Sequence, residues 1–130
     1  MLKPGQLIDE KYRIVRLVGE GGMGAVYEAE HAFLERLVAI KVLAPGMAES
    51  PEAIRRFYQE AKAAAKIGHE NICEVTDVGQ TQGGMPYIVM QLLHGKSLAA
   101  EIAAKGPLRI GRAVDVATQA LAALSAAHAA

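Results

Sequence analysis

Four glycines stand within six residues near the start of the chain, as Gly19-Glu20-Gly21-Gly22-Met23-Gly24. Because glycine has no side chain, the backbone N–H groups of such a turn can approach the oxygens of a phosphate closely. The Gly-x-Gly-x-x-Gly spacing can therefore hold a nucleotide, but it fits a flexible hairpin equally well. The residues on either side decide between these interpretations.

The residues after the glycines exclude the dinucleotide-binding form of this pattern. In that form the glycines lead into a helix whose N-terminus receives a pyrophosphate, and an acidic residue follows about 20 residues later. Here Ala25–His31 alternates in the manner of a strand, and the basic Lys41 stands where the acidic residue is expected. What remains is a glycine-rich hairpin between two strands.

Lys41 is the one charged residue in the run Leu37–Leu43. A lysine in such a strand can extend its ammonium to solvent along its apolar stem. A second interpretation involves Glu60, which lies in or beside an apolar helix face made by Ile54, Phe57, Ala61, Ala64 and Ala65. A carboxylate directed at a core is costly unless it is paired. This pattern predicts an ion pair between Lys41 and Glu60, which would orient the ammonium toward phosphate oxygens.

The elements that must position these residues follow from periodicity and turn signals. Runs rich in β-branched residues predict five strands, at Tyr12–Val18, Ala25–His31, Leu37–Leu43, Ile72–Val78 and Tyr87–Gln91. The connections between the first three are too short for a parallel crossover, so these strands form an antiparallel meander.

Helices occupy the rest of the chain. Ser50 and Pro51 predict the start of a helix that runs to about Ile67. Ser97 is placed to cap a short helix that stops at Gly106-Pro107, and a longer helix begins near Arg109. The fold class is therefore α+β: a five-stranded antiparallel sheet with one packed helix, followed by two further helices.

The composition excludes several classes of protein. The 130 residues carry 14 basic and 14 acidic side chains, a balance that argues against a nucleic-acid binder or a polybasic membrane anchor. The Ala-rich stretch 113–130 contains polar residues and is a poor membrane span, and the first ten residues lack the apolar run of a signal peptide. Four scattered histidines and a single cysteine, Cys73, predict no metal site and a reducing compartment, so we expect a cytoplasmic protein.

Several motifs in order resemble the N-terminal lobe of a bacterial Ser/Thr protein kinase of the eukaryotic type, continuing through its hinge and first C-lobe helices. They are Gly19–Tyr27, Val38-Ala39-Ile40-Lys41, Phe57-Tyr58-Gln59-Glu60-Ala61, His69-Glu70-Asn71-Ile72 and Tyr87-Ile88-Val89-Met90. The resemblance implies an N-terminal extension at 1–10, a kinase N-lobe and hinge at 11–93, and an incomplete start of the C-lobe at 94–130.

The resemblance also implies a role for each matching residue in an ATP site. Lys41 and Glu60 would be the catalytic pair, with Lys41 on the α- and β-phosphates. The loop residues Gly19, Glu20, Gly21, Gly22, Met23 and Gly24 would cover the phosphates, and Val18 and Ala25 on either side would also belong to the nucleotide site. Adenine would lie against Val26, Ala39 and the gatekeeper Met90, with hinge contacts to the backbone of Gln91 and Leu93 and a ribose contact from Ser97. Gln91 stands where the family has Glu, but this contact uses the main chain, so the departure has little effect.

The residues that complete phosphoryl transfer in this family are absent from the sequence. Neither His-Arg-Asp nor Asp-Phe-Gly occurs, so the catalytic Asp and the Asp that holds Mg²⁺ are missing, and Mg²⁺ is expected only with residues outside this chain. We expect the chain alone to be inactive. Two readings stay open: the ATP-binding part of an active kinase with a protein substrate, or a natural half-kinase that serves as a regulatory module with a protein partner.

The last helix carries an apolar stripe of Ile110, Val114, Ala117, Leu121 and Leu124. Their spacing of three and four residues places them on one face. In the kinase family the rest of the C-lobe would bury this face, and an open apolar patch of this kind marks an interface. We therefore expect self-association through the two C-terminal helices.

Overall fold

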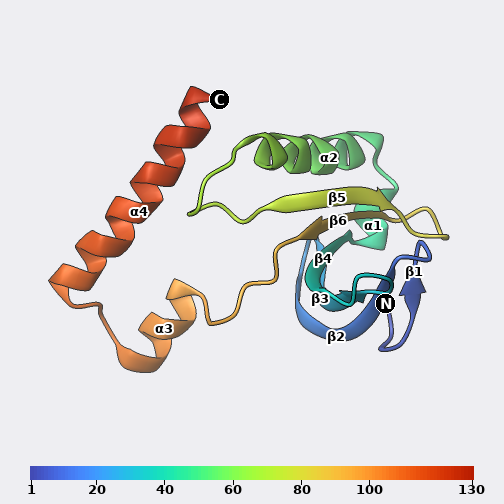
Figure 1. Cartoon of the computed structure of the whole chain (residues 1–130), viewed down its shortest axis with the longest axis horizontal. Coiled ribbons are helices and arrows are strands. Elements are labelled where there is room, and N and C mark those ends of the chain that lie inside the picture. Colours follow the sequence, from blue (N-terminus) through green and yellow to red (C-terminus); the bar gives the residue numbers. More distant parts are fainter. The chain divides into compact units, whose positions relative to one another are not determined.

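The computed structural model describes residues 1–130, which fall into two units. The first unit contains Met1–Lys66 and Cys73–Leu92, and the second contains Ile67–Ile72 and Leu93–Ala130. The strands belong to the first unit, and the two C-terminal helices belong to the second (Figure 1).

Six strands form one antiparallel sheet in the order β1-β2-β3-β4-β6-β5 (Figure 1). They are β1 Leu7–Ile8, β2 Tyr12–Gly21, β3 Gly24–His31, β4 Leu37–Leu43, β5 Val75–Gln80 and β6 Pro86–Met90. The predicted α+β fold class and the antiparallel meander are confirmed, with one addition. The edge strand β1 has two residues, too few to show the period of two by which a strand is recognised in a sequence.

The start of β5 differs from the predicted strand Ile72–Val78. The backbone N–H of Ile72 donates to the carbonyl of His69, at 3.1 Å, and Ile72 belongs to the second unit. The sheet ladder begins only at Val75, which lies opposite Met90. The predicted strand therefore begins three residues before the chain enters the sheet.

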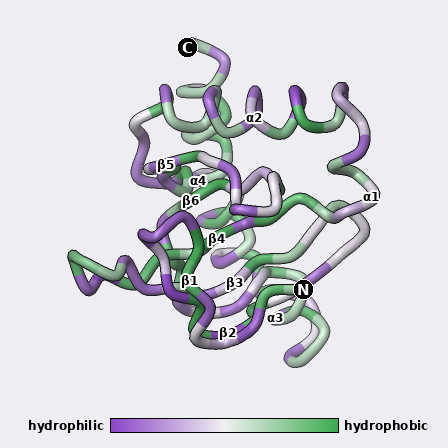
Figure 2. The backbone as a smooth tube through the Cα atoms, turned by 90° about the vertical axis from the view of Figure 1, so that its right-hand side faces the viewer, coloured by the Kyte–Doolittle hydropathy of each residue, from purple (hydrophilic) through white to green (hydrophobic).

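Helix α2, Pro51–Lys66, begins and ends close to the predicted residues. The hydroxyl of Ser50 accepts a hydrogen bond from the backbone N–H of Ala53, at 3.3 Å, which is the expected cap. Phe57 and Ala61 are buried against the sheet, and Figure 2 shows hydrophobic and hydrophilic residues alternating along the helix. A short helix α1, Pro45–Ala48, precedes it and was not predicted.

Two apolar clusters lie on opposite faces of the sheet. One, inside the curl of the strands, is formed by Ile8, Tyr12, Ile14, Tyr27, Ala29, Ile40, Val42, Tyr87 and Val89. The other lies under α2 and is formed by Leu43, Phe57, Ala61 and Ile88. Because side chains alternate along a strand, the second face also carries Lys41, two residues before Leu43.

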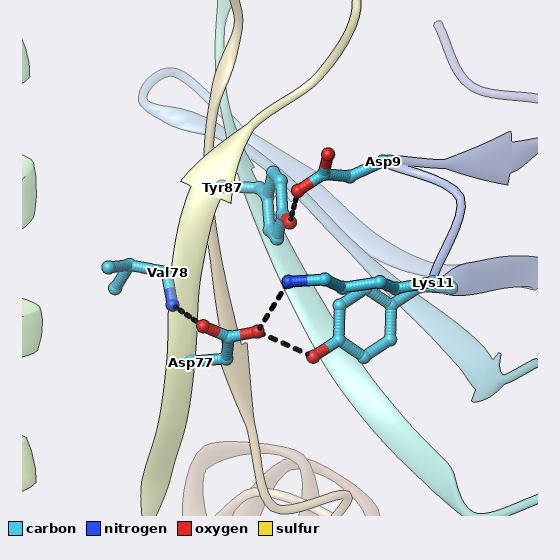
Figure 3. A network of polar contacts seen from close by, with 6 residues as sticks. Asp9, Lys11, Asp77, Val78 and Tyr87 are labelled. Atoms are coloured by element: carbon cyan, nitrogen blue, oxygen red, sulfur yellow. Dashed lines mark hydrogen bonds and ion pairs between the residues drawn. The ribbon is translucent and has the colours of Figure 1, made fainter. Parts of the chain in front are cut away.

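Two tyrosine–aspartate hydrogen bonds join strands from opposite ends of the sheet order. The hydroxyl of Tyr12 in β2 donates to Asp77 in β5 at 2.8 Å, and that of Tyr87 in β6 donates to Asp9 beside β1 at 2.7 Å. Figure 3 shows Tyr87 directed at Asp9, and Lys11 directed at Asp77 with its ammonium 4.0 Å away. Burial, and then the neighbouring carboxylates, raise the pKa of both tyrosines above the ordinary value. These bonds hold the curled sheet closed.

The second unit contains α3, Leu98–Lys105, and α4, Ile110–Ala129. Ser97 caps α3 as predicted, since its hydroxyl accepts from the N–H of Ala100 at 3.1 Å. Arg112 and Glu101 join the two helices at 2.8 Å. Neither helix combines the length and the apolar character that a membrane crossing requires.

The predicted apolar stripe of α4 has no partner within its unit. Ile110 is 84% exposed and Leu121 is 63% exposed, and Val114 and Leu124 are also exposed. The half-buried residues of α4 lie on another face, at Ala113, Val116, Ala123, Ala126 and Ala127. On this helix the stripe therefore faces outward, while four alanines and Val116 make the contacts.

Candidate functional site

The glycine-rich hairpin joins β2 to β3 through a tight turn. Gly21 pairs with Gly24, and Gly19 pairs with Val26. A side chain on Gly24 would place its Cβ 2.0 Å from the carbonyl oxygen of Val42, so only glycine fits there. In contrast, a Cβ on Gly19, Gly21 or Gly22 would meet no atom within 4 Å. Contacts within the chain therefore do not require these three glycines.

A cleft of about 360 Å³ lies beneath this hairpin. It is lined by all six residues from Gly19 to Gly24 together with Val26 and Lys41. Val26 pairs with Lys41 in the β3–β4 ladder, and residues directly opposite each other project from the same face of a sheet. The structure thus places the ammonium of Lys41 beneath a turn whose backbone is not covered by side chains at Gly19, Gly21 and Gly22.

The same face of the sheet carries the other strand residues predicted for the site. Ala39 lies two residues before Lys41 and directly opposite Met90, so both project from the face that carries Val26. Ala39 is buried and Met90 is half-buried. The register therefore places Val26, Ala39, Lys41 and Met90 in one continuous surface.

Lys41 and Glu60 form no ion pair, so the predicted contact is wrong for this structure. Glu60 is exposed and lines a neighbouring cleft with Met23 and Phe57. The ammonium of Lys41 instead lies 6.0 Å from the centre of the Phe57 ring, at the outer limit of a cation–π contact. Phe57 is the residue of α2 that is buried against the sheet. Glu60 lies at the edge of this buried helix face and is exposed to solvent.

The family of this chain follows from a match along most of its length. The protein kinase domain model matches residues 12–130. The chain belongs to the protein kinase family.

The chain is similar to bacterial Ser/Thr kinases. It is 40% identical over 124 residues to the serine/threonine-protein kinase PrkC of Bacillus subtilis, covering 95% of this chain and 19% of PrkC. It is 40% identical over 129 residues to a probable serine/threonine-protein kinase, PknB, of Lactococcus lactis, covering 98% of this chain and 20% of that protein. The crystal structure of the PknI kinase domain from Mycobacterium tuberculosis is 34% identical, with a TM-score of 0.85, over 98% of this chain and 51% of that chain. The chain thus spans about a fifth of the length of those two curated relatives.

The remaining predicted residues of this kinase chain lie outside the cleft. Val18 is exposed, at an irregularity of the β2–β3 ladder between Leu17 and Gly19. Ala25 projects from the opposite face of the hairpin and lines a different cleft. Leu93 and Ser97 belong to the second unit, where the Ser97 hydroxyl caps α3.

Gln91 makes a contact that the sequence did not predict. Its N–H donates to the carbonyl of Glu74 at 2.8 Å, and its own carbonyl accepts from the thiol of Cys73 at 3.4 Å. Burial raises the pKa of that thiol, which keeps it protonated as a donor. A carbonyl oxygen has two lone pairs, so one remains for another donor. Beyond the Val75–Met90 pair, the antiparallel register brings Glu74 opposite Gln91, and Cys73 is the next residue along.

Proposed function

We propose that this chain binds ATP and that its cleft supplies the phosphate-binding half of a Ser/Thr protein kinase site. The observation that carries the proposal is the cleft lined by Gly19–Gly24 and Lys41, on a chain of the protein kinase family. Packing within the chain does not require glycine at three of these positions, Gly19, Gly21 and Gly22. A phosphate that approaches the backbone closely would require the absence of side chains there. Backbone N–H groups of the turn would receive the phosphate oxygens, and Lys41 would hold the α- and β-phosphates.

The adenine end of the proposed site uses the sheet face beside Lys41. Val26, Ala39 and Met90 offer apolar contact to the base, and the free lone pair of the Gln91 carbonyl offers an acceptor. By resemblance to the family, we also propose that the backbone N–H of Leu93 contacts adenine and that the hydroxyl of Ser97 contacts the ribose. In the complete kinase domain Glu60 would form an ion pair with Lys41. This would require a movement of α2, because Phe57 is the residue of that helix that faces Lys41.

Phosphoryl transfer to protein Ser or Thr is proposed for the whole protein, with the other half of the domain. Positioning and charge stabilisation provide nearly all of the rate in this chemistry. The described residues contain no group of three acidic, histidine or cysteine side chains that could hold a metal ion. In this family an Asn of the catalytic loop and the Asp of Asp-Phe-Gly hold Mg²⁺, and neither motif occurs in this sequence. We propose that Mg²⁺ enters with ATP and is held by residues outside these 130, and that the chain alone is inactive. The alternative is a regulatory half-kinase that binds a protein partner without transfer.

We also propose that the chain is divided into an N-lobe with its hinge and the beginning of a C-lobe. A further proposal is a cytoplasmic location, where ATP is available and the thiol of Cys73 stays reduced. The exposed stripe on α4 supports a further proposal, self-association of the isolated chain through its C-terminal helices.

Isothermal titration with ATP tests the role of Lys41. A charge-assisted hydrogen bond in this half-open site contributes about 1.4 kcal/mol, so Lys41→Met should weaken binding roughly tenfold. Lys66→Met is the matched control, because it removes the same charge from the far end of α2 and should leave the affinity unchanged. Equal affinities for the wild type and Lys41→Met would contradict the assignment.

A further inference from the structure

The glycine-rich hairpin has a second face, and the N-terminal residues lie against it. Side chains alternate along β3 and β4, so Val26 and Lys41 face the cleft proposed for phosphate, while Ala25, Tyr27 and Val42 face the other way. On that opposite face lies a cleft of about 260 Å³. Met1 and Leu2 line it together with Glu20, Gly21, Gly24 and Ala25 of the hairpin.

The segment 1–8, called the N-terminal strap here, is fixed to the sheet at two places. Its far end pairs with β2, where the N–H of Gly5 donates to the carbonyl of Ile14 at 2.8 Å and the N–H of Ile14 donates to Gln6 at 2.9 Å. Its near end is held by Leu2, whose N–H donates to the hydroxyl of Tyr27 at 3.2 Å and whose side chain packs on the buried cluster. The strap thus reaches from the first residues of β2 to the back of the glycine turn.

The stretch of β2 that the strap spans is irregular. The β2–β3 ladder shifts register between Ile14 and Arg16 and again between Leu17 and Gly19. Such bulges interrupt the pairing and bend the strand, so the ladder alone fixes the glycine tip weakly. Other contacts near the tip are the hydrogen bond from the Ala44 N–H to the Met23 carbonyl, at 2.9 Å, and the close approach of Gly24 to Val42.

We propose that the N-terminal strap is a positioning element of the nucleotide site and that Leu2 is its main positioning residue. The inference rests on the proposed ATP function. Leu2 supports the hairpin from behind and keeps the backbone N–H groups of the turn aimed into the phosphate cleft. Without it the hairpin spends less time in the competent position, and the apparent affinity falls in proportion to the lost population.

The test compares nucleotides with and without phosphates, using the full 130-residue chain. Leu2→Gln should weaken ATP and ADP binding roughly fivefold, as a hairpin competent about a fifth of the time would. Adenosine affinity should stay the same, because it does not use the turn. Leu2→Ile should restore ATP binding, and Leu7→Gln, on the exposed side of the strap, should have no effect.

Amide hydrogen exchange gives a second readout, independent of ligand. Leu2→Gln should accelerate exchange at residues 19–24 and leave the amides of β6 unchanged. Unchanged exchange at the hairpin, or an equal loss of ATP and adenosine affinity, would overturn the inference, since the second result means general destabilisation. If the wild-type chain binds ATP and Leu2→Gln binds it with the same affinity, this inference alone is overturned. A wild-type chain that binds no ATP would overturn the proposed function as well.

Discussion

Lys41 shows how a single residue can have the predicted place and a different neighbour. Its strand, its register with Val26 and its cleft are those expected of a lysine that contacts phosphate. Its neighbour on α2 is the ring of Phe57, because Phe57 is the residue that the helix buries. A ring contact near 6 Å is weak, so the ammonium is free to bind an anion at little cost.

Glu60 is expected to contribute little to the stability of this chain. The Glu60 carboxylate is exposed and forms no ion pair, so its replacement removes no stabilising contact. Glu60→Gln should therefore change the free energy of unfolding by less than about 0.5 kcal/mol. Phe57→Ala is the contrast, with an expected loss of about 3 kcal/mol from the cavity it leaves. Urea denaturation of both variants measures this. A loss above about 1 kcal/mol for Glu60→Gln would mean that a pair with Lys41 forms in solution.

At the scale of elements, the sheet depends on bonds that join strands far apart in its order. Tyr12 and Tyr87 are buried, their rings meet edge to face 6.1 Å apart, and each hydroxyl donates to an aspartate. The sheet can therefore curl around its core without a continuous ladder. The glycine hairpin and the strap are both joined to β2, so this closure also positions the cleft beneath the hairpin.

The tyrosines make the fold sensitive to alkali. Their folded pKa lies above the unfolded value of 10.0, so the folded state holds its phenolic protons more tightly. Their contribution to stability is complete below about pH 10 and is lost as pH rises toward the folded pKa. We expect the free energy of unfolding to fall above pH 10, and a Tyr12→Phe Tyr87→Phe variant to show a shallower fall. Urea titrations at several pH values measure it, and identical slopes would contradict the assignment.

At the scale of the whole chain, the sequence predicted what local signals determine. The capped starts of α2 and α3, the antiparallel meander and the placement of Lys41 under a glycine hairpin all follow from short patterns. The misses involve contacts between distant segments. No local pattern reveals that β1 pairs with β2, that Cys73 lies beside Gln91, or that Phe57 rather than Glu60 faces Lys41.

The exposed stripe on α4 predicts the behaviour of the isolated chain. Ile110, Val114, Leu121 and Leu124 leave a long apolar face in water, which association would cover. Light scattering at tens of micromolar should give a mass above the 13.8 kDa of one chain. Leu121→Glu with Leu124→Glu should return it to a monomer. A monomeric wild type would contradict the prediction.

Binding of ATP beneath the glycine hairpin can be tested directly by mapping amide chemical shifts during an ATP titration. Half a site binds weakly, so the titration should extend to about millimolar ATP. We expect shifts at residues 19–24 and at Val26, Ala39 and Lys41. Shifts confined to the larger cleft of about 480 Å³ near Tyr12, His31 and Asp77, or no shifts at all, would contradict it.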